Sequence, residues 1–210
     1  KPFGRATLAD GIAVKGLGRY TFPLIRKLVS DVVLVTETAV EEAIFAFASL
    51  QKTVAEGASA AGLAALLAYR ERFHGRNVGL LHTGANIDPR VLSSILVRGL
   101  ERDGKIVALR LSIPDRPGML GEIASELGRC GVNILEVDHR RFYLNVPAKG
   151  AVVEIVIETK NLDHARKAVE RLRSHGFEVT WIGNGTTFSA SDTARDLGGG
   201  ETVAPVDKFI

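Results

Sequence analysis

Hydrophobic and polar residues alternate from Leu109 to Ile113, and this period of two predicts a half-buried strand. Pro114 is expected to end the strand because proline has no N–H group for the ladder. Apolar residues then recur at the spacing of an amphipathic helix, at Leu120, Ile123, Ala124 and Leu127. In the turn between them, we expect Asp115 to cap the helix and Pro117 to occupy its first turn.

The same two periods continue for about fifty residues and complete one small domain. Alternation predicts further strands over residues 132–141, 151–159 and 177–181. A second amphipathic helix is expected to begin at Asn161 or Asp163. The predicted order of elements is βαββαβ, which is the ferredoxin-like plan.

The first hundred residues show helical patterns that alternate with short apolar runs. These runs predict buried strands at residues 32–35 and 77–81. A capping box predicts that one helix starts at Thr38, and Asp88 before a proline predicts the start of another. This order is typical of an α/β fold with a doubly wound parallel sheet. Because two strands are too few to close such a core, we expect the chain to be a fragment of a longer protein.

Composition narrows the class of protein. Of the 210 residues, 46% are hydrophobic and 24% are charged, which is ordinary for a globular protein with a core. The net charge of +3 arises from interspersed basic and acidic residues, so we expect no nucleic-acid partner. No apolar run has the length of a membrane span, and the one cysteine, Cys130, fits a reducing compartment. We therefore expect a cytoplasmic protein without a membrane partner, and no histidine spacing predicts a metal site.

Two short stretches carry a resemblance to a known family. Residues 113–118 read Ile-Pro-Asp-Arg-Pro-Gly, and residues 131–134 read Gly-Val-Asn-Ile. Amides at a helix start favour a carboxylate, while Asp115 and Asn133 would attract an ammonium group, so both ends of an amino acid are met. The stretches resemble an ACT domain, a family that binds a small effector, usually an amino acid, commonly between subunits. The resemblance implies a homo-oligomer and these effector-binding residues: Asp115, Arg116, Pro117, Gly118, Asn133 and Ile134.

A simpler interpretation of the same residues stays open. Asp115 would only cap the helix, Pro117 and Gly118 would only form the turn, and Asn133 would only end a strand.

A second resemblance covers residues 1–181. The segments Leu8-Ala-Asp-Gly-Ile, Glu56-Gly-Ala and Leu81-His-Thr-Gly-Ala-Asn-Ile-Asp88 precede the ACT-like stretch in order. Together they resemble the C-terminal part of a threonine dehydratase, a family that uses pyridoxal 5′-phosphate in the fold-type II architecture. The resemblance implies a cofactor-binding set of Glu56, Thr83, Gly84, Ala85 and Asn86, with the Thr83 hydroxyl at the pyridine nitrogen. Glu56 is equally typical of an acid at a helix start, and His82 is expected to pack in its loop.

Two elements of that family do not occur in residues 1–210. These are the Ser-x-Lys-x-Arg-Gly context of the Schiff-base lysine and the glycine-rich phosphate cradle. The resemblance therefore implies that this chain contains no catalytic residue and is inactive alone, and we assign it no metal site.

The resulting hypothesis divides the chain into three parts. Residues 1–103 are the C-terminal part of a catalytic domain that uses pyridoxal phosphate, residues 104–182 are an ACT regulatory domain, and residues 183–210 are a flexible tail. The full-length protein would be a threonine (serine) dehydratase that converts L-threonine to 2-oxobutanoate and ammonia under control of an amino-acid effector. The alternative is a stand-alone amino-acid-binding regulatory protein without catalysis.

Overall fold

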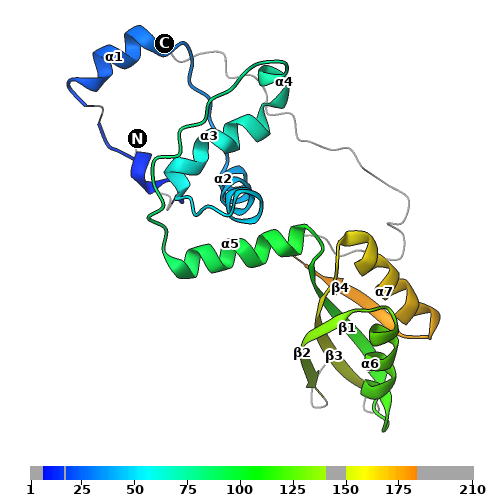
Figure 1. Cartoon of the computed structure of the whole chain (residues 1–210). Coiled ribbons are helices and arrows are strands. Elements are labelled where there is room, and N and C mark those ends of the chain that lie inside the picture. Colours follow the sequence, from blue (N-terminus) through cyan, green and yellow to red (C-terminus); the bar gives the residue numbers. More distant parts are fainter. Residues whose placement is uncertain (1–6, 17, 141–149, 184–210) are drawn as a thin grey trace. The chain divides into compact units, whose positions relative to one another are not determined.

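The computed structural model describes residues 7–16, 18–140 and 150–183, and the chain divides into two compact units, Lys1–Asp103 and Gly104–Ile210 (Figure 1). The described residues of the first unit form helices, and those of the second form a sheet with two helices. The first unit contains η1 (Asp10–Ile12), α1 (Thr21–Leu28), α2 (Glu37–Ala46), the π-helical turn η2 (Phe47–Gln51), α3 (Gly57–Ala68), α4 (Arg70–Phe73) and α5 (Pro89–Arg102). The second contains β1 (Ile106–Pro114), α6 (Met119–Arg129), β2 (Asn133–Arg140), β3 (Gly150–Glu158), α7 (Leu162–Ser174) and β4 (Glu178–Ile182).

Helices α2, α3 and α5 pack around a small apolar core in the first unit. Alanine dominates α3, and such small side chains let the backbones of neighbouring helices approach closely. An ion pair between Arg98 and Glu41, with an N–O distance of 2.9 Å, joins α5 to α2 at the edge of this core. The buried apolar residues of this cluster are Val40, Ala43, Ile44, Ala55, Ala60, Ala64 and Ile95.

Two predicted helix starts in this unit have different outcomes. Asp88 caps α5 as predicted, because its Oδ1 accepts hydrogen bonds from the backbone N–H groups of Arg90 and Val91 at 2.9 and 3.0 Å. The predicted capping box at Thr38 is wrong. Helix α2 begins at Glu37, and its N-cap is Thr36, two residues before Thr38, whose hydroxyl accepts a hydrogen bond from the N–H of Ala39 at 3.1 Å.

The strands predicted at residues 32–35 and 77–81 are also wrong. Neither segment joins a β-ladder in the described part of the chain, and Val32, Leu34 and Leu81 are 74%, 78% and 86% exposed. An apolar run becomes a strand only when another strand pairs with its N–H and C=O groups. These two segments have no such partner among the described residues, so the doubly wound sheet expected here is not formed by them.

The second unit has the predicted βαββαβ order. Its four strands form an antiparallel sheet in the order β2-β3-β1-β4. Leu109 lies opposite Ile155, and Leu111 lies opposite Val153, so alternate residues of β1 and β3 share one face. The ferredoxin-like prediction is confirmed by the described elements from β1 to β4, whereas residues 141–149 and residues 184–210 of the predicted tail lie outside the described residues.

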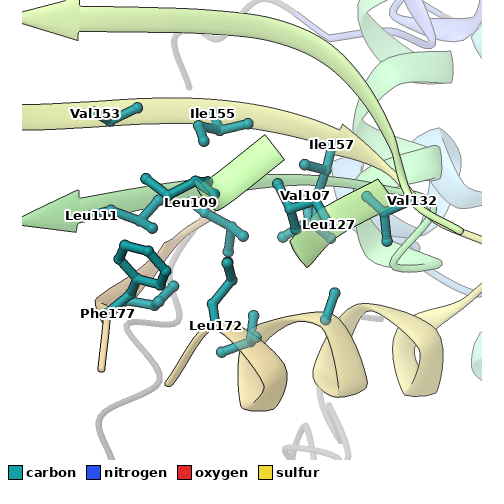
Figure 2. Close-up of a cluster of buried hydrophobic side chains, with 14 of the residues drawn as sticks. Val107, Leu109, Leu111, Leu127, Val132, Val153, Ile155, Ile157, Leu172 and Phe177 are labelled. Carbon is teal, nitrogen blue, oxygen red and sulfur yellow. The ribbon is translucent and has the colours of Figure 1, made fainter. Parts of the chain in front are cut away.

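Helices α6 and α7 cover that face and close the main core. Figure 2 shows Leu172 of α7 reaching toward Leu109 in the sheet, with Leu127 and Phe177 nearby. Leu109, Leu127 and Leu172 are fully buried, which is the burial that the alternating and helical apolar patterns predict.

A buried carboxylate joins the two helices on the outer side of this core. Glu126 of α6 accepts a hydrogen bond from the Arg171 guanidinium of α7 at 2.6 Å, and it also pairs with Arg129 and with His175. Burial raises the pKa of the Glu126 carboxyl, but the hydrogen bond from Arg171 and the surrounding positive charges outweigh burial and lower this pKa below its ordinary value. The carboxylate therefore stays ionised and holds α6 to α7.

Among the residues that the structure describes, no helix combines the length and the apolar character that a bilayer span needs.

Candidate functional site

The loop of residues 82–86 lies against the start of α3, and backbone hydrogen bonds hold it there. The Glu56 N–H donates to the Gly84 carbonyl at 3.1 Å, and the Thr83 N–H donates to the Ser59 hydroxyl at 2.9 Å. The Glu56 carboxylate accepts a third hydrogen bond from the Asn86 N–H, also at 3.1 Å. These three hydrogen bonds fix the backbone of the loop at residues 83, 84 and 86. They use none of the side chains of these loop residues.

Gly84 leaves room for the Glu56 carboxylate where the loop meets the start of α3. A Cβ atom at position 84 would lie 2.4 Å from Oε1 and 2.6 Å from Cδ of Glu56. Such a separation is far below van der Waals contact, so any larger residue would displace the carboxylate.

Glu56 therefore does more than place an acid at a helix start. It is the N-cap residue of α3, yet its side chain makes no capping hydrogen bond and reaches the loop instead. A carboxylate at this end of α3 is also favoured by the helix dipole, as the simpler interpretation of Glu56 expects.

The loop presents Thr83, Ala85 and Asn86 as exposed side chains. The Thr83 hydroxyl makes no hydrogen bond to any described residue, whereas the Thr83 backbone is fixed. A hydroxyl that is held in place and exposed can donate to or accept from a ligand. The predicted residues Glu56, Thr83, Gly84, Ala85 and Asn86 thus lie together, and the donor set fits a cofactor with a ring nitrogen.

His82 packs within the loop, in agreement with the sequence. Its Nε2 lies 3.0 Å from the Val54 carbonyl, and its ring meets the Phe47 ring edge-on with centroids 5.3 Å apart. Phe47 opens the π-helical turn η2, and the turn ends at Lys52, which has a left-handed φ of 57°. This irregular end of α2 therefore shapes one side of the loop.

Sequence reasoning missed two residues of this region. Ser59 is 4% exposed and accepts from the loop backbone. Glu37, at the start of α2, accepts from the Leu8 N–H at 2.9 Å and from the Thr7 hydroxyl, so it ties the Leu8 segment to the helix. A small polar residue within an alanine-rich helix was the one signal available for Ser59.

A second candidate site is a small surface pocket of about 110 Å³ at the turn between β1 and α6. Gly118 is the N-cap of α6 with a φ of 92°, so the prediction that Asp115 occupies the cap position is wrong. Asp115 lies three residues before Gly118, so it is not the residue at which α6 begins. Gly118 suits the cap position because glycine adopts a positive φ without strain. The pocket is lined by Ile113, Pro114, Asp115, Arg116, Pro117, Gly118, Met119, Leu120, Gly121 and His139.

The structure separates Asn133 and Ile134 from this pocket. Asn133 pairs with Glu158, which in turn pairs with Ile106 at the start of β1, and its amide donates to the Glu158 carboxylate at 3.1 Å. Pro114, at the far end of β1, is eight residues from Ile106, which is a span of about 26 Å, and Asp115 follows it. Within one chain, therefore, Asp115 and Asn133 do not meet, and Ile134 packs against the core.

His139 of β2 lines the pocket, and sequence reasoning did not select it. Its Nε2 is buried and has no hydrogen-bond partner among the described residues. The available signal was a histidine at an inward position of a strand, which by pattern alone looks like any other core residue.

Comparison with known proteins identifies both units. Residues 1–84 match the family described as pyridoxal-phosphate dependent enzyme, and residues 107–174 match the ACT domain. The two matches lie in the order that both resemblances implied, with the pyridoxal-phosphate dependent enzyme model before the ACT domain model.

The curated proteins that the chain is similar to are ammonia-lyases. The chain is 37% identical over 180 residues to L-threonine ammonia-lyase of Thermotoga maritima, covering 86% of this chain and 45% of that protein. It is 39% identical over 174 residues to L-threonine ammonia-lyase of Geobacter sulfurreducens, covering 82% of this chain and 43% of that protein. An L-threo-3-hydroxyaspartate ammonia-lyase of a Pseudomonas species is 38% identical over 91 residues, covering 43% of this chain and 28% of that protein. The chain spans less than half the length of these curated relatives.

Proposed function

We propose that the full-length protein is a pyridoxal-phosphate dependent threonine (serine) ammonia-lyase whose ACT domain binds an amino-acid effector. The observation that carries the proposal is that similarity to two L-threonine ammonia-lyases runs through both units, over 82–86% of this chain. The loop held by Glu56 supports it, because a sensor without catalysis would not need a fixed loop with an exposed hydroxyl.

In the reaction, L-threonine loses its α-proton and its β-hydroxyl, which leave together as water. Water then hydrolyses the resulting enamine to 2-oxobutanoate and ammonia. Bound pyridoxal phosphate supplies the electron sink that makes the α-proton acidic. Thr83 would place its neutral hydroxyl at the pyridine nitrogen, Gly84 and Ala85 would leave room for the ring, and Glu56 would hold the loop through Asn86.

We propose that the chain alone does not turn over substrate. No lysine of residues 1–210 lies in the Ser-x-Lys-x-Arg-Gly context, and a lysine amine is the group that would both bind the cofactor and move the α-proton. We place the activity in the cytoplasm, where a protein with one cysteine needs no disulfide.

We also propose that two copies of the chain complete the effector site. Asp115 and Asn133 lie at opposite ends of the sheet in one copy, so a single ligand that touches both must lie between two copies. The effector would be an amino acid, whose carboxylate suits the helix start and whose ammonium suits Asp115.

The catalytic part is tested on the full-length protein, with pyridoxal phosphate and L-threonine, by the rate of 2-oxobutanoate formation. Thr83→Ala removes the hydroxyl, and we expect kcat to fall at least about tenfold, the cost of one lost hydrogen bond of average strength. Thr83→Ser keeps the hydroxyl and serves as the control, with a rate close to that of the wild type. Wild-type protein that releases no 2-oxobutanoate would overturn the proposed reaction, and equal rates for both variants would remove Thr83 from the site.

A further inference from the structure

Ser59 is the polar residue of a helix that is otherwise apolar. The other residues of α3 are glycine, alanine and leucine, and Ser59 is 4% exposed among them. Alanine is a better helix former than serine, and a buried hydroxyl costs stability unless it makes a hydrogen bond. Alanine would therefore suit position 59 better as far as the helix is concerned, so the reason for a serine lies in what its hydroxyl binds.

The Ser59 hydroxyl binds the loop of residues 82–86. Its Oγ accepts a hydrogen bond from the Thr83 N–H at 2.9 Å. Three residues earlier, the N–H of the N-cap residue Glu56 donates to the Gly84 carbonyl at 3.1 Å. The N-cap and the third helical residue lie side by side on the first turn of a helix. One turn of α3 therefore holds the loop at two successive residues.

These two hydrogen bonds fix the backbone on both sides of the Thr83 side chain. The Thr83 N–H belongs to the peptide unit before its Cα, and the Gly84 carbonyl belongs to a peptide unit after it. Threonine is β-branched, so its side chain also has little freedom about χ1. The Thr83 hydroxyl is exposed and makes no hydrogen bond to any described residue. It is thus a positioned group that is available to a ligand.

We propose that Ser59 is a positioning residue for the cofactor: it holds the Thr83 N–H and so sets the place from which the Thr83 hydroxyl binds the ring nitrogen of pyridoxal phosphate. This inference rests on the proposed function, in which Thr83 meets that nitrogen, and it adds a residue that acts through Thr83. A hydroxyl that is already in place does not have to be ordered when the cofactor binds, and this favours affinity.

The first test is a double-mutant cycle on the full-length protein, read as the dissociation constant of pyridoxal phosphate in a fluorescence titration of the cofactor-free form. We expect Ser59→Ala to raise this constant about fivefold, which is the effect of one hydrogen bond of average strength. In the Thr83→Ala background, Ser59→Ala should change the constant less than about twofold, because the hydroxyl that Ser59 positions is then absent.

Amide hydrogen exchange of the cofactor-free full-length protein gives a readout that does not involve the cofactor. Ser59→Ala should speed exchange of the Thr83 N–H about fivefold, because this N–H loses its acceptor. The Glu56 N–H is bound to the Gly84 carbonyl and should keep its rate. Since alanine favours the helix, we expect α3 to stay folded in the variant.

Ser94→Ala is the matched control. It also removes a serine hydroxyl from a helix of the first unit, but the Ser94 hydroxyl donates to the Arg90 carbonyl of its own helix α5, at 3.0 Å. This variant should change neither the dissociation constant of the cofactor nor the exchange rate of the Thr83 N–H.

Equal effects of Ser59→Ala with and without the Thr83 hydroxyl would overturn the inference, because Ser59 would then support the fold and not Thr83. An unchanged dissociation constant in Ser59→Ala would overturn it as well. Either result leaves the proposed reaction standing where the wild type still forms 2-oxobutanoate from L-threonine. A wild-type protein that binds no pyridoxal phosphate would overturn the proposed function and this inference together.

Discussion

The absence of a Cβ atom at Gly84 lets the Glu56 carboxylate lie against the candidate cofactor loop. The Glu56 carboxylate occupies the space that a Cβ at position 84 would need, and from that position it accepts the Asn86 N–H. The loop and the helix start are thus fitted to one another at the scale of one methyl group.

Gly84→Ala is therefore expected to push the flexible Glu56 carboxylate aside and to destabilise the first unit by about 1 kcal/mol, the cost of the lost hydrogen bond from the Asn86 N–H. Gly79→Ala is the matched control, because a Cβ at position 79 meets nothing within 4 Å and should change stability little. Urea unfolding of both variants measures the difference. Equal midpoints for the two would show that the carboxylate moves aside without cost.

The same scale shows why sequence reasoning found some site residues and missed others. Glu56 and the loop 83–86 could be selected because their segments, in this order along the chain, resemble a known family. His139 could not, because its partnerless Nε2 depends on which residues surround it after folding. The predicted cap at Asp115 failed because the left-handed turn at Gly118 changes where the helix begins.

At the scale of elements, α6 and α7 are joined by charge as well as by apolar packing. Glu126 is 6% exposed, and its carboxylate accepts a hydrogen bond from Arg171 of the neighbouring helix α7. The pKa of Glu126 is lower in the folded chain than its ordinary value of 4.5, so the ionised form stabilises the fold. This contribution is present above about pH 4.5 and is lost as the pH falls through the folded-state pKa.

We therefore expect the stability of the second unit to fall as the pH is lowered below about 4.5, and Glu126→Gln to weaken that dependence. The variant should also be less stable than the wild type at pH 7, because Arg129 and Arg171 lose their common partner. Glu170→Gln on the exposed side of α7 is the control and should keep the wild-type profile. Denaturant unfolding across this pH range measures the effect, and parallel profiles for wild type and Glu126→Gln would contradict it.

The predicted strands of the two units also differ in whether the hydrophobic pattern of the segment alone is enough to predict a strand. The strands of the second unit were predictable because alternation, turns and helix stripes all lie within one contiguous stretch, and each strand has its partner there. Residues 32–35 and 77–81 have equally apolar sequences, but a ladder partner is a property of the surrounding fold and not of the segment. Local pattern gave the right answer only where the partner was also local.

At the scale of the whole molecule, the two units differ in how complete they are. The core of the second unit draws on both helices and all four strands, whereas the first unit leaves Val32, Leu34 and Leu81 largely exposed. Apolar exposure on this scale costs stability in an isolated unit.

A polypeptide of residues 104–183 is accordingly expected to fold by itself and to unfold cooperatively in urea. A polypeptide of residues 1–103 should unfold at lower urea or without a cooperative transition. Circular dichroism of the two pieces tests the difference. A cooperative first piece beside a non-cooperative second piece would reverse this assignment of stability.

The antiparallel pairing of β1 with β4 has one more consequence. Ala108, the third residue of β1, lies opposite Ile182, the last residue of β4, at about 5 Å, so the chain enters and leaves the domain on the same side. A module whose two ends meet can be spliced into or out of a host protein at a single surface point, with neither host nor module having to refold around it. The arrangement makes the second unit suitable for insertion into another protein as a unit.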